Sequence, residues 1–431
     1  MMLRTEIAYR LGQLHIEDVP LDRIAREFGT PIYVYSRAAL AQAYAAYASA
    51  CHGRDALVCY AVKANSNLAL LQLLSQWGAG FDIVSGGELD RVLAAGGDPK
   101  KVVFSGVGKS TAEIGHALEH DIACFNVESF SELKRLDALA RDHGMRARVS
   151  LRINPDVDPK THPYISTGLK RTKFGIPFAS ALQAYREAAR LSHLEIVGID
   201  CHIGSQLLDE APLLEALDRL MALVDQLEGE RIRIRHLDVG GGVGIAYQGE
   251  ATVSVPEFVT RVLNRIAAWR DARYQGLPLR VLFEPGRSIV GDAGVLLTRV
   301  EYLKPGAEKN YAIVDAAMND LLRPALYDAW HEVVPFQEAQ SGARLWDIVG
   351  PICESGDWLA HDRELALSEG DLVAFLSAGA YGMTMASNYN TRARAAEVLV
   401  DGGRVHLIRE RESIASLFAL ERLLPQPLPR S

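Results

Sequence analysis

The sequence predicts an α/β protein: a (β/α)8 barrel of the TIM type and a second, mostly antiparallel β domain. Between residues 56 and 283, eight short runs rich in Val, Ile and Leu alternate with amphipathic stretches of helical length. Past residue 290 this alternation stops, and short strand-like runs separated by turn residues follow. The length of 431 residues exceeds one ordinary domain and suits a large barrel with a second domain.

The barrel elements are expected after a short strand at 32–35 and an alanine-rich helix at 37–50. The eight barrel strands are expected at Ala56–Tyr60, Phe81–Val84, Val102–Phe104, Ile122–Val127, Val149–Ile153, Glu195–Cys201, His236–Val239 and Val281–Phe283. Helices are expected at Leu68–Trp77, Gly87–Ala95, Thr111–His120, Ser129–His143, Ser180–Ser192, Glu210–Glu228 and Pro256–Asp271. A doubly wound open sheet is the alternative, but such a sheet seldom needs eight consecutive parallel strands.

The second domain is expected to be built from short strands that turn signals separate. Those strands are expected at Val295–Tyr302, Asn310–Asp315, Leu345–Val349, Leu372–Leu376, Ala396–Val400 and Val405–Ile408. Turn sequences such as Lys304-Pro305-Gly306 lie between them, and the N-terminal strand is expected to complete the sheet. We therefore expect a barrel domain at residues 29–290 and a β domain made of residues 1–28 together with 291–431.

The composition is that of a soluble globular protein, with 48% apolar and 23% charged residues. A net charge of −8 and a pI near 5.9 argue against a general nucleic-acid binder. No apolar run approaches the length of a membrane span, and Met1–Glu6 lack the apolar core of a secretory signal, so a cytoplasmic protein is expected. The cysteines are odd in number and scattered, which fits reduced thiols and neither a disulfide framework nor a zinc site: Cys51, Cys59, Cys124, Cys201 and Cys353.

Polar or glycine residues follow most of the expected barrel strands. They are Lys63, Ser85-Gly86-Gly87-Glu88, Arg152-Ile153-Asn154-Pro155, His202-Ile203-Gly204-Ser205-Gln206, Gly240-Gly241-Gly242-Val243-Gly244 and Glu284-Pro285-Gly286-Arg287. The C-terminal ends of the strands carry the chemistry of TIM barrels. The sequence therefore predicts a site at this end of the barrel.

Lys63 stands where the first barrel strand ends, within Cys59-Tyr60-Ala61-Val62-Lys63-Ala64-Asn65. Low dielectric at such a position disfavours the ammonium form, so we expect a lowered pKa for Lys63. A neutral lysine is the nucleophile of Schiff-base chemistry. The alternative is a lysine whose charged end reaches the surface just past a strand.

The triple glycine at 240–242 fits a phosphate loop, because bare backbone can approach an anion closely. A tight turn between strand and helix explains it equally well. It is not a dinucleotide fingerprint, since the last glycine of that pattern is replaced by Tyr247. Gly108-Lys109-Ser110 resembles the end of a P-loop, but Val103 stands where the first glycine is required.

Two further residues, His202 and Glu284, each allow two interpretations. His202 is either a packed histidine or a ring lying on a flat ligand. Glu284 is either the ion-pair partner of Arg287 or the partner of a protonated ring nitrogen. Cys353 taken alone is a small apolar residue, and Tyr327 taken alone is a packing residue.

Together these segments resemble the fold type III, pyridoxal-phosphate-dependent decarboxylases, and among them the members that act on diaminopimelate. The matching segments run in the family's order from about residue 28 to 390. They are Tyr60-Ala61-Val62-Lys63-Ala64-Asn65, Phe81-Asp82-Ile83-Val84-Ser85, Thr172-Lys173-Phe174-Gly175, His202-Ile203-Gly204-Ser205, Gly240-Gly241-Gly242, Glu284-Pro285-Gly286-Arg287, Met318-Asn319-Asp320 with Arg323-Pro324-Ala325-Leu326-Tyr327, Cys353-Glu354-Ser355 and Ala380-Tyr381. A single segment of this kind is weak, but the ordered set is highly specific.

The resemblance implies a role for each matching residue. Lys63 would hold pyridoxal 5′-phosphate covalently, His202 would stack on its ring, and Glu284 would pair with the ring nitrogen. Its phosphate would be held by Ser205, Gly242, Gly286, Arg287 and Tyr381. The distal carboxylate of the substrate would be received by Arg287, Arg323, Tyr327 and Tyr381. Glu354 would bind the distal ammonium and Cys353 would deliver a proton, both from the second subunit of a homodimer.

Two positions narrow the implied reaction. The related alanine racemases present an arginine to the ring nitrogen, so Glu284 favours decarboxylation. The related ornithine decarboxylases usually carry aspartate after the cysteine and lack the Arg-Pro-x-Leu-Tyr segment, so Glu354 and Arg323 favour a substrate with a second carboxylate.

The resemblance therefore implies decarboxylation of meso-2,6-diaminoheptanedioate at its D-centre to L-lysine and CO2, the last step of lysine biosynthesis. The alternatives are a decarboxylase of ornithine, lysine or arginine, and a homologue that binds the cofactor without catalysis.

Overall fold

The computed structural model describes residues 5–158, 167–168, 172–273, 278–338 and 341–424. The chain divides into two compact units. The barrel unit contains Ala38–Ala293 and Gly379–Thr384, and the sheet unit contains the described residues within Leu3–Arg37, Gly294–Ala378 and Met385–Ser431. Each unit is described by itself.

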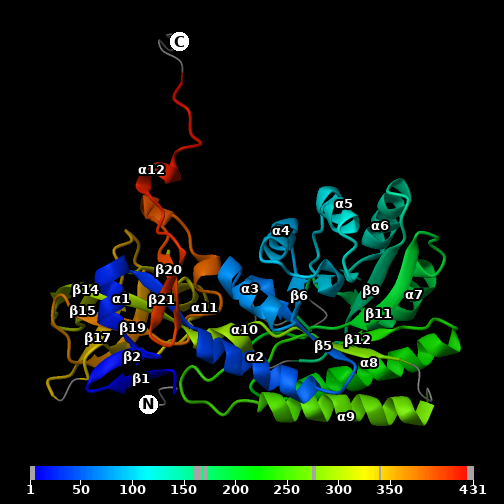
Figure 1. Ribbon diagram of the computed structural model, residues 1–431, viewed down its shortest axis with the longest axis horizontal. Helices are drawn as coiled ribbons and strands as arrows, with labels where there is room; N and C mark the ends of the chain where they lie inside the picture. Colours follow the sequence, from blue (N-terminus) through cyan, green and yellow to red (C-terminus); the bar gives the residue numbers. More distant parts are fainter. Residues whose placement is uncertain (1–4, 159–166, 169–171, 274–277, 339–340, 425–431) are drawn as a thin grey trace. The chain divides into compact units, whose positions relative to one another are not determined.

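The barrel unit is built on a closed ring of parallel strands (Figure 1). Around the ring these are β5 (Ala56–Ala61), β6 (Gly80–Ile83), β7 (Val102–Phe104), β8 (Cys124–Val127), β9 (Ala147–Asn154), β11 (Leu194–Asp200), β12 (His236–Asp238) and β13 (Arg280–Phe283), and β13 pairs with β5. The two-residue strand β10 (Ile176–Pro177) pairs with the end of β9. All eight expected strands are present, so the predicted barrel is confirmed.

The helices of the barrel unit lie outside the ring of strands, and four of those described begin with a side-chain cap. Asn67, Ser85, Ser110 and Ser129 each accept a backbone N–H of the helix that follows, and Ser110 forms a capping box with Glu113. The helices are α2 (Arg37–Cys51), α3 (Leu68–Gln76), α4 (Gly86–Ala94), α5 (Thr111–Glu119), α6 (Phe130–Asp142), α7 (Ala181–Ala188), α8 (Ala211–Gly229), α9 (Val255–Arg273) and α10 (Arg287–Val290).

The barrel interior changes from apolar to polar along the strands. Its apolar part is a cluster formed by Cys59, Val103, Cys124, Val197 and Leu282. Two residues further along three of these strands come Ser105, Asn126 and Glu284, which share the inward face because side chains of a strand alternate. The polar part therefore lies at the C-terminal ends of the strands, where the site was expected.

The sheet unit is a mostly antiparallel sheet. Its strands are β4 (Ile32–Ser36), β14 (Gly294–Lys304), β15 (Tyr311–Val314), β16 (Val333–Pro335), β17 (Arg344–Val349), β18 (Trp358–Leu365), β19 (Leu372–Phe375), β20 (Ala396–Asp401) and β21 (Arg404–Arg409). The small sheet β1 (Ile7–Arg10), β2 (Gln13–Ile16) and β3 (Val19–Pro20), with helix α1 (Leu21–Phe28), packs on its apolar core. The short helices α11 (Arg323–Tyr327) and α12 (Ile414–Leu417) complete the unit.

The N-terminal part of the chain completes the second sheet, as expected. Strand β4 pairs antiparallel with β14 and parallel with β20, although the expected boundary at residue 29 would place β4 with the barrel. The domain boundaries themselves stay a prediction. None of the helices in the described ranges is long and apolar enough to cross a bilayer.

Candidate active site

Lys63 lies in a turn, Val62–Ala64, directly after β5, and its amine donates to a carboxylate of the neighbouring strand. The distance from Lys63 Nζ to Asp82 Oδ2 is 2.6 Å, and Asp82 is completely buried while 35% of the Lys63 side chain is exposed. Burial is the largest single effect on the pKa of Lys63 and lowers it, whereas Asp82 raises it through its charge and its hydrogen bond. Tyr381 and Glu284 act in the same direction, so the net effect raises the pKa above its ordinary value.

The expectation of a lowered pKa at Lys63 is therefore wrong. The sequence shows that the lysine follows a buried strand, but not that the next strand aims a carboxylate at it. In the protein alone, Lys63 carries an ammonium group paired with Asp82. Covalent attachment to an aldehyde requires this proton to leave first.

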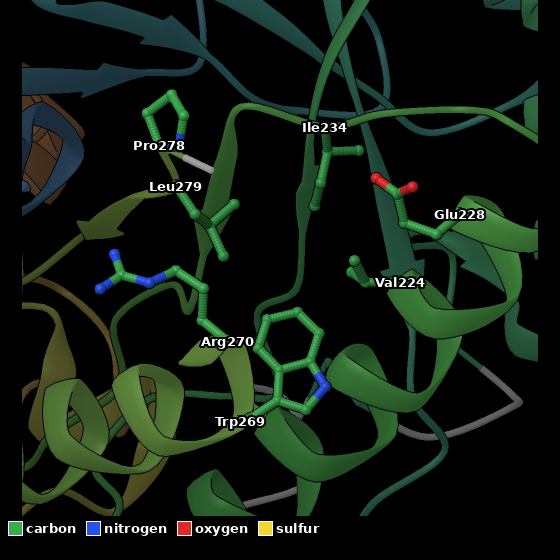
Figure 2. A pocket seen from close by; sticks show the side chains of 7 residues that line it. All are labelled: Val224, Glu228, Ile234, Trp269, Arg270, Pro278 and Leu279. Carbon is green, nitrogen blue, oxygen red and sulfur yellow. The ribbon is translucent and has the colours of Figure 1, made fainter. Parts of the chain in front are cut away.

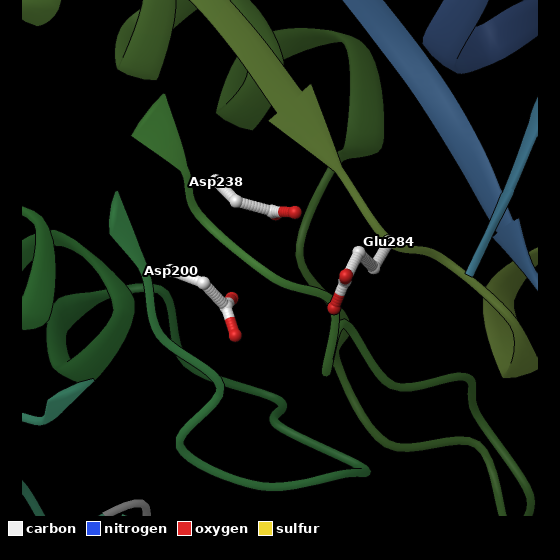
Figure 3. Close-up of side chains that lie close together, drawn as sticks. All are labelled: Asp200, Asp238 and Glu284. Carbon is white, nitrogen blue, oxygen red and sulfur yellow. The ribbon is translucent and has the colours of Figure 1, made fainter. Parts of the chain in front are cut away.

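Three buried carboxyl groups converge from three consecutive strands of the ring (Figure 3). Asp200 ends β11, Asp238 ends β12 and Glu284 follows β13, and one oxygen of each lies within 4.8 Å of the others. Asp238 Oδ1 accepts the backbone N–H of Gly240 at 2.9 Å, and the Asp238 and Glu284 side chains share a hydrogen bond. A hydrogen bond between two carboxyl groups needs a proton between them.

This cluster holds protons at neutral pH. Burial, together with the neighbouring carboxylates, raises the pKa of Glu284 well above its ordinary value. Burial also raises the pKa of Asp238 to about 7, against the opposing effect of its hydrogen bonds from Gly240 and Glu284. Asp200 Oδ1 and Asp238 Oδ2 accept no hydrogen bond from the described residues, so a proton or a cation brought to the cluster is stabilised there.

The expected alternative for Glu284, an ion pair with Arg287, does not match the contacts of Glu284 among the described residues. Glu284 Oε1 lies 3.5 Å from Asn126 Nδ2, and its other carboxylate side meets Asp238. Arg287 instead donates to Tyr247 at 2.7 Å and to Ser205 at 3.2 Å. The backbone leaves β13 in a turn that points these two neighbouring side chains at different partners.

His202 follows β11 and is held as a neutral imidazole. Its Nδ1 accepts the backbone N–H of Gly241 at 3.2 Å, which places the ring proton on Nε2. Burial lowers the pKa of His202 well below its ordinary value, and the positive charges of Arg152 and Lys63 lower it further. An uncharged, fixed ring of this kind can pack against a flat ligand without repelling a cation.

The glycines at 240–242 fit closely between neighbouring strand ends. Gly240 and Gly242 have positive φ angles of 68° and 109°. A Cβ on Gly241 would overlap the carbonyl oxygen of Glu284, and one on Gly242 would overlap that of Gly204. The loop therefore requires glycine for packing, whether or not it also binds an anion.

Arg287 is the centre of a second group at the same end of the barrel unit. It is buried at the start of α10, next to Gly286, where a Cβ would contact Ala64. Its guanidinium lies 4.8 Å from the ring of Tyr381. The backbone N–H of Tyr381 donates to Ala64 O at 2.8 Å, which ties this tyrosine to the turn that carries Lys63.

These residues fit pyridoxal phosphate by the chemistry of their donor groups. Lys63 supplies an amine for an aldehyde, and Glu284 supplies a buried carboxyl group for a ring nitrogen. Arg287 and the hydroxyl of Ser205 supply donors for a phosphate, and His202 supplies a neutral ring. The structure brings all of the barrel-unit residues of the predicted site to the C-terminal ends of the strands.

The other predicted site residues lie in the sheet unit. Arg323 is buried on α11, and Tyr327 is half-buried at the end of that helix. Cys353 has an exposed thiol, unlike the other four cysteines, and its backbone N–H donates to Asn390 Oδ1 at 2.9 Å. The carboxylate of Glu354 accepts from the hydroxyl of Tyr389 and raises the pKa of that hydroxyl.

Sequence reasoning gave no role to several residues of this region. Asp200 and Asp238 are the last residues of β11 and β12. Arg152, which contacts Glu128 at 3.1 Å, lies two residues before the end of β9 and pairs in register with Asp200. A polar residue at or near the end of a buried strand was the available signal for all three.

A small cavity elsewhere in the barrel unit has no part in this site (Figure 2). It measures about 30 Å³, room for a water molecule, and lies between the C-terminal turns of α8 and α9. Ile234 and Leu279 line it just before β12 and β13 begin, at the opposite ends of the strands that carry Asp238 and Glu284. It is a gap in helix packing.

The sequence and the fold are similar to those of known decarboxylases. Residues 37–291 match the pyridoxal binding domain of the pyridoxal-dependent decarboxylases. The diaminopimelate decarboxylase of Pseudomonas aeruginosa is 58% identical over 419 residues, which cover 97% of this chain and 99% of the relative.

Two solved structures agree. That of diaminopimelate decarboxylase from Helicobacter pylori complexed with L-lysine has a TM-score of 0.88 at 44% identity, covering 93% of this chain and 99% of that one. That of the M. jannaschii enzyme in complex with L-lysine has a TM-score of 0.93 at 38% identity, covering 98% and 99%. The chain thus belongs to the diaminopimelate decarboxylase family of pyridoxal-dependent decarboxylases.

Proposed function

We propose that this protein removes the carboxyl group at the D-centre of meso-2,6-diaminoheptanedioate, releasing CO2 and L-lysine, as the last step of lysine biosynthesis. The observation that carries this proposal is the 58% identity to a diaminopimelate decarboxylase over almost the whole of both chains. The amine of Lys63 and the carboxyl cluster around Glu284, at one end of the barrel, supply the groups that the reaction needs.

Bound pyridoxal phosphate supplies an aldehyde for covalent attachment and a ring that accepts the electron pair left when CO2 departs. Lys63 holds that aldehyde through its amine. Glu284 keeps a proton at the ring nitrogen, since its carboxyl group is buried among other carboxyl groups. His202 packs on the ring, and the phosphate is held by Ser205, Gly242, Gly286, Arg287 and Tyr381.

The protein selects its substrate by binding the two charged groups at the distal end, a carboxylate and an ammonium. The distal carboxylate is received by Arg323, whose planar guanidinium can form two parallel hydrogen bonds, with Arg287, Tyr327 and Tyr381 as further donors. The distal ammonium is bound by Glu354. A substrate without the second carboxylate cannot form this contact with the buried Arg323, so it is expected to bind more weakly.

Cys353 is proposed to deliver the proton that replaces the lost carboxyl group. Its thiol is exposed, which supports a role in the active site of another subunit. We therefore propose a cytoplasmic homodimer in which Cys353 and Glu354 serve the site of the other subunit. A dimer mass in solution, and activity restored by mixing Lys63→Ala with Cys353→Ala subunits, are the expected results. Two inactive variants that stay inactive when mixed would contradict a shared site.

The covalent role of Lys63 is tested by reduction of the holoenzyme with borohydride followed by peptide mapping. The label is expected on the peptide that contains Lys63, and Lys63→Ala is expected to lose at least about 10³-fold in activity. Lys109 is the internal control, because this buried lysine pairs with Glu132 and should stay unlabelled. Release of CO2 from ornithine, with diaminopimelate untouched, would assign the protein to the alternative substrate class.

A further inference from the structure

A chain of two hydrogen bonds in the sheet unit connects Arg323 to the backbone carbonyl of Leu376, the residue after β19, through a buried histidine. Arg323 Nη1 lies 2.8 Å from His331 Nε2, and His331 Nδ1 lies 2.9 Å from the carbonyl oxygen of Leu376. His331 is completely buried and Arg323 is 6% exposed. No role was assigned to His331 by the sequence or by the site described above.

The partners of His331 determine where its ring proton lies. A carbonyl oxygen only accepts, so Nδ1 donates its proton to Leu376 O. A guanidinium only donates, so Nε2 must be unprotonated and accept from Arg323. The ring is therefore neutral and is used at both nitrogens.

Hydrogen bonds to the backbone of His331 and of its neighbour Glu332 hold this segment in place. The backbone N–H of Leu376 donates to Glu332 O at 2.8 Å, next to the point where the His331 ring meets the Leu376 carbonyl. Arg363 Nη2 donates to His331 O at 3.2 Å, and its guanidinium lies 3.1 Å from the ring centre of Trp330. These contacts come from Arg363 on β18 and from Leu376 directly after β19, so the ring is positioned by residues in or next to regular strands.

We propose that His331 is a positioning residue that orients the guanidinium of Arg323 toward the distal carboxylate of the substrate. By this action it sets the preference for diamino acids that carry a second carboxylate. The inference rests on the proposed function, in which Arg323 receives that carboxylate. A guanidinium has five N–H groups, so one hydrogen bond to His331 is compatible with a two-point contact to a carboxylate.

The chemical type of His331 suits this task. An Asp or Glu acceptor would fix Arg323 equally well but would neutralise its charge and weaken its attraction for an anion. A neutral imidazole fixes the plane of the guanidinium and leaves the charge in place. Because Arg323 is buried and bound to His331, its side chain is already ordered before the substrate binds. Binding therefore costs less conformational entropy.

The test compares two ligands that differ in the distal carboxylate only, L-lysine and cadaverine. Their dissociation constants are measured by titration calorimetry on the holoenzyme. In His331→Leu the constant for L-lysine is expected to rise about tenfold or more, or ~1.4 kcal/mol, while that for cadaverine stays within about twofold. His331→Gln is expected to retain most of the affinity, because its amide can accept from Arg323 and donate to Leu376.

Controls separate positioning from loss of structure. His236→Leu removes another histidine, one that packs against Gly198 in the barrel unit, and should leave the lysine-to-cadaverine ratio unchanged. Thermal unfolding and cofactor absorption report on folding. Where His331→Leu does not fold, His331→Asn replaces it, since the shorter amide cannot span both partners and lysine affinity should again fall.

Equal weakening of both ligands, or an unchanged affinity for L-lysine, in His331→Leu or His331→Asn overturns the proposal. Arg323→Leu, measured in parallel, distinguishes two kinds of failure. If Arg323→Leu loses lysine affinity and the His331 variants do not, only the role of His331 is wrong. If Arg323→Leu also binds lysine normally, the carboxylate site in the proposed function is wrong as well.

Discussion

At the strand ends of the barrel unit, Asp200, Asp238 and Glu284 bring three buried carboxyl groups together, whereas in the sheet unit Arg323 is held by an uncharged imidazole. The first group has more acid than its surroundings neutralise, and its members take up protons. The second keeps its positive charge, because His331 accepts a hydrogen bond without adding a negative charge. An excess of acid suits a protonated ring nitrogen, and a guanidinium that donates to a neutral acceptor suits a carboxylate.

The comparison shows that the partner of a functional charge determines what that charge can bind. Lys63, paired with Asp82 at 2.6 Å, has its charge satisfied within the protein. The hydrogen bond from Arg323 to the neutral ring of His331 does not offset the positive charge of Arg323. Four variants test this difference, in order of decreasing effect.

Glu284→Gln tests the acidic side of the comparison most directly. The variant keeps the shape of the side chain but cannot hold a proton at a ring nitrogen as a carboxylate does. Turnover is expected to fall about 10²- to 10³-fold, the usual size of losing one electrostatic stabilising group at a reacting centre. CO2 release measures it. Glu113→Gln, at the start of α5, removes a capping carboxylate of the same unit and should leave turnover near that of the wild type.

His331→Glu tests the other side by giving Arg323 a charged acceptor. The guanidinium stays fixed but loses most of its attraction for an anion. The dissociation constant of L-lysine is expected to rise about 100-fold, because charge-assisted hydrogen bonds contribute ~1.5–3 kcal/mol. His331→Gln is the matched neutral control. Similar lysine affinity in the Glu and Gln variants would show that the charge of the partner does not matter.

The sequence predicted the barrel well because its signal is local. Apolar runs and capping residues such as Ser85, Ser110 and Ser129 set each strand and helix independently of the rest. Strands β16 and β18 were missed, since β16 is a three-residue edge strand and β18 carries charged residues such as Arg363 in its middle. The sheet formed by β1–β3 was missed because its strands have no more than four residues.

The candidate site was predictable only where a residue type has a distinctive place in the sequence. Lys63, the glycines at 240–242 and Glu284 stand at strand ends and form recognisable segments. The electrostatic state of these residues was not predictable, because it depends on contacts between strands. Asp82, 19 positions after Lys63, is the first of the groups that together raise the pKa of that lysine. His331 likewise gains its role only through the carbonyl of Leu376, 45 positions away.

Asp238→Asn tests whether the acidic cluster lowers the free energy of unfolding of the apoenzyme. The pKa of Asp238 is raised to about 7 in the folded protein, from an ordinary value of 3.8. The folded state therefore binds the extra proton between these values, and the free energy of unfolding of the apoenzyme falls as pH rises from about 4 to 7. The variant should lose part of this slope and be more stable than wild type at pH 8, by on the order of 1–3 kcal/mol.

Urea unfolding of the two apoenzymes at pH 4 to 8 measures this difference. Asp271→Asn is the control, since 68% of that side chain is exposed and its removal should not change the slope. Turnover of the Asp238→Asn holoenzyme should be lower in spite of the added stability. Parallel curves for wild type and Asp238→Asn would mean that Asp238 is ionised throughout.

Arg363→Lys is expected to have the smallest effect, because Arg363 acts on Arg323 only through the segment that carries His331. Its flat guanidinium lies 3.1 Å from the ring centre of Trp330, and Nη2 donates to His331 O at 3.2 Å. Burial lowers the pKa of Arg363 to about 10, because the charged guanidinium is less well solvated in the protein than in water. Lysine keeps the charge but cannot stack as a plane, and lysine affinity should weaken about two- to fivefold while cadaverine affinity stays constant. A loss of affinity for L-lysine alone, smaller than that in His331→Leu, would show that β18 also helps to position Arg323. An equal loss of affinity for both ligands would show that His331 positions Arg323 without help from β18.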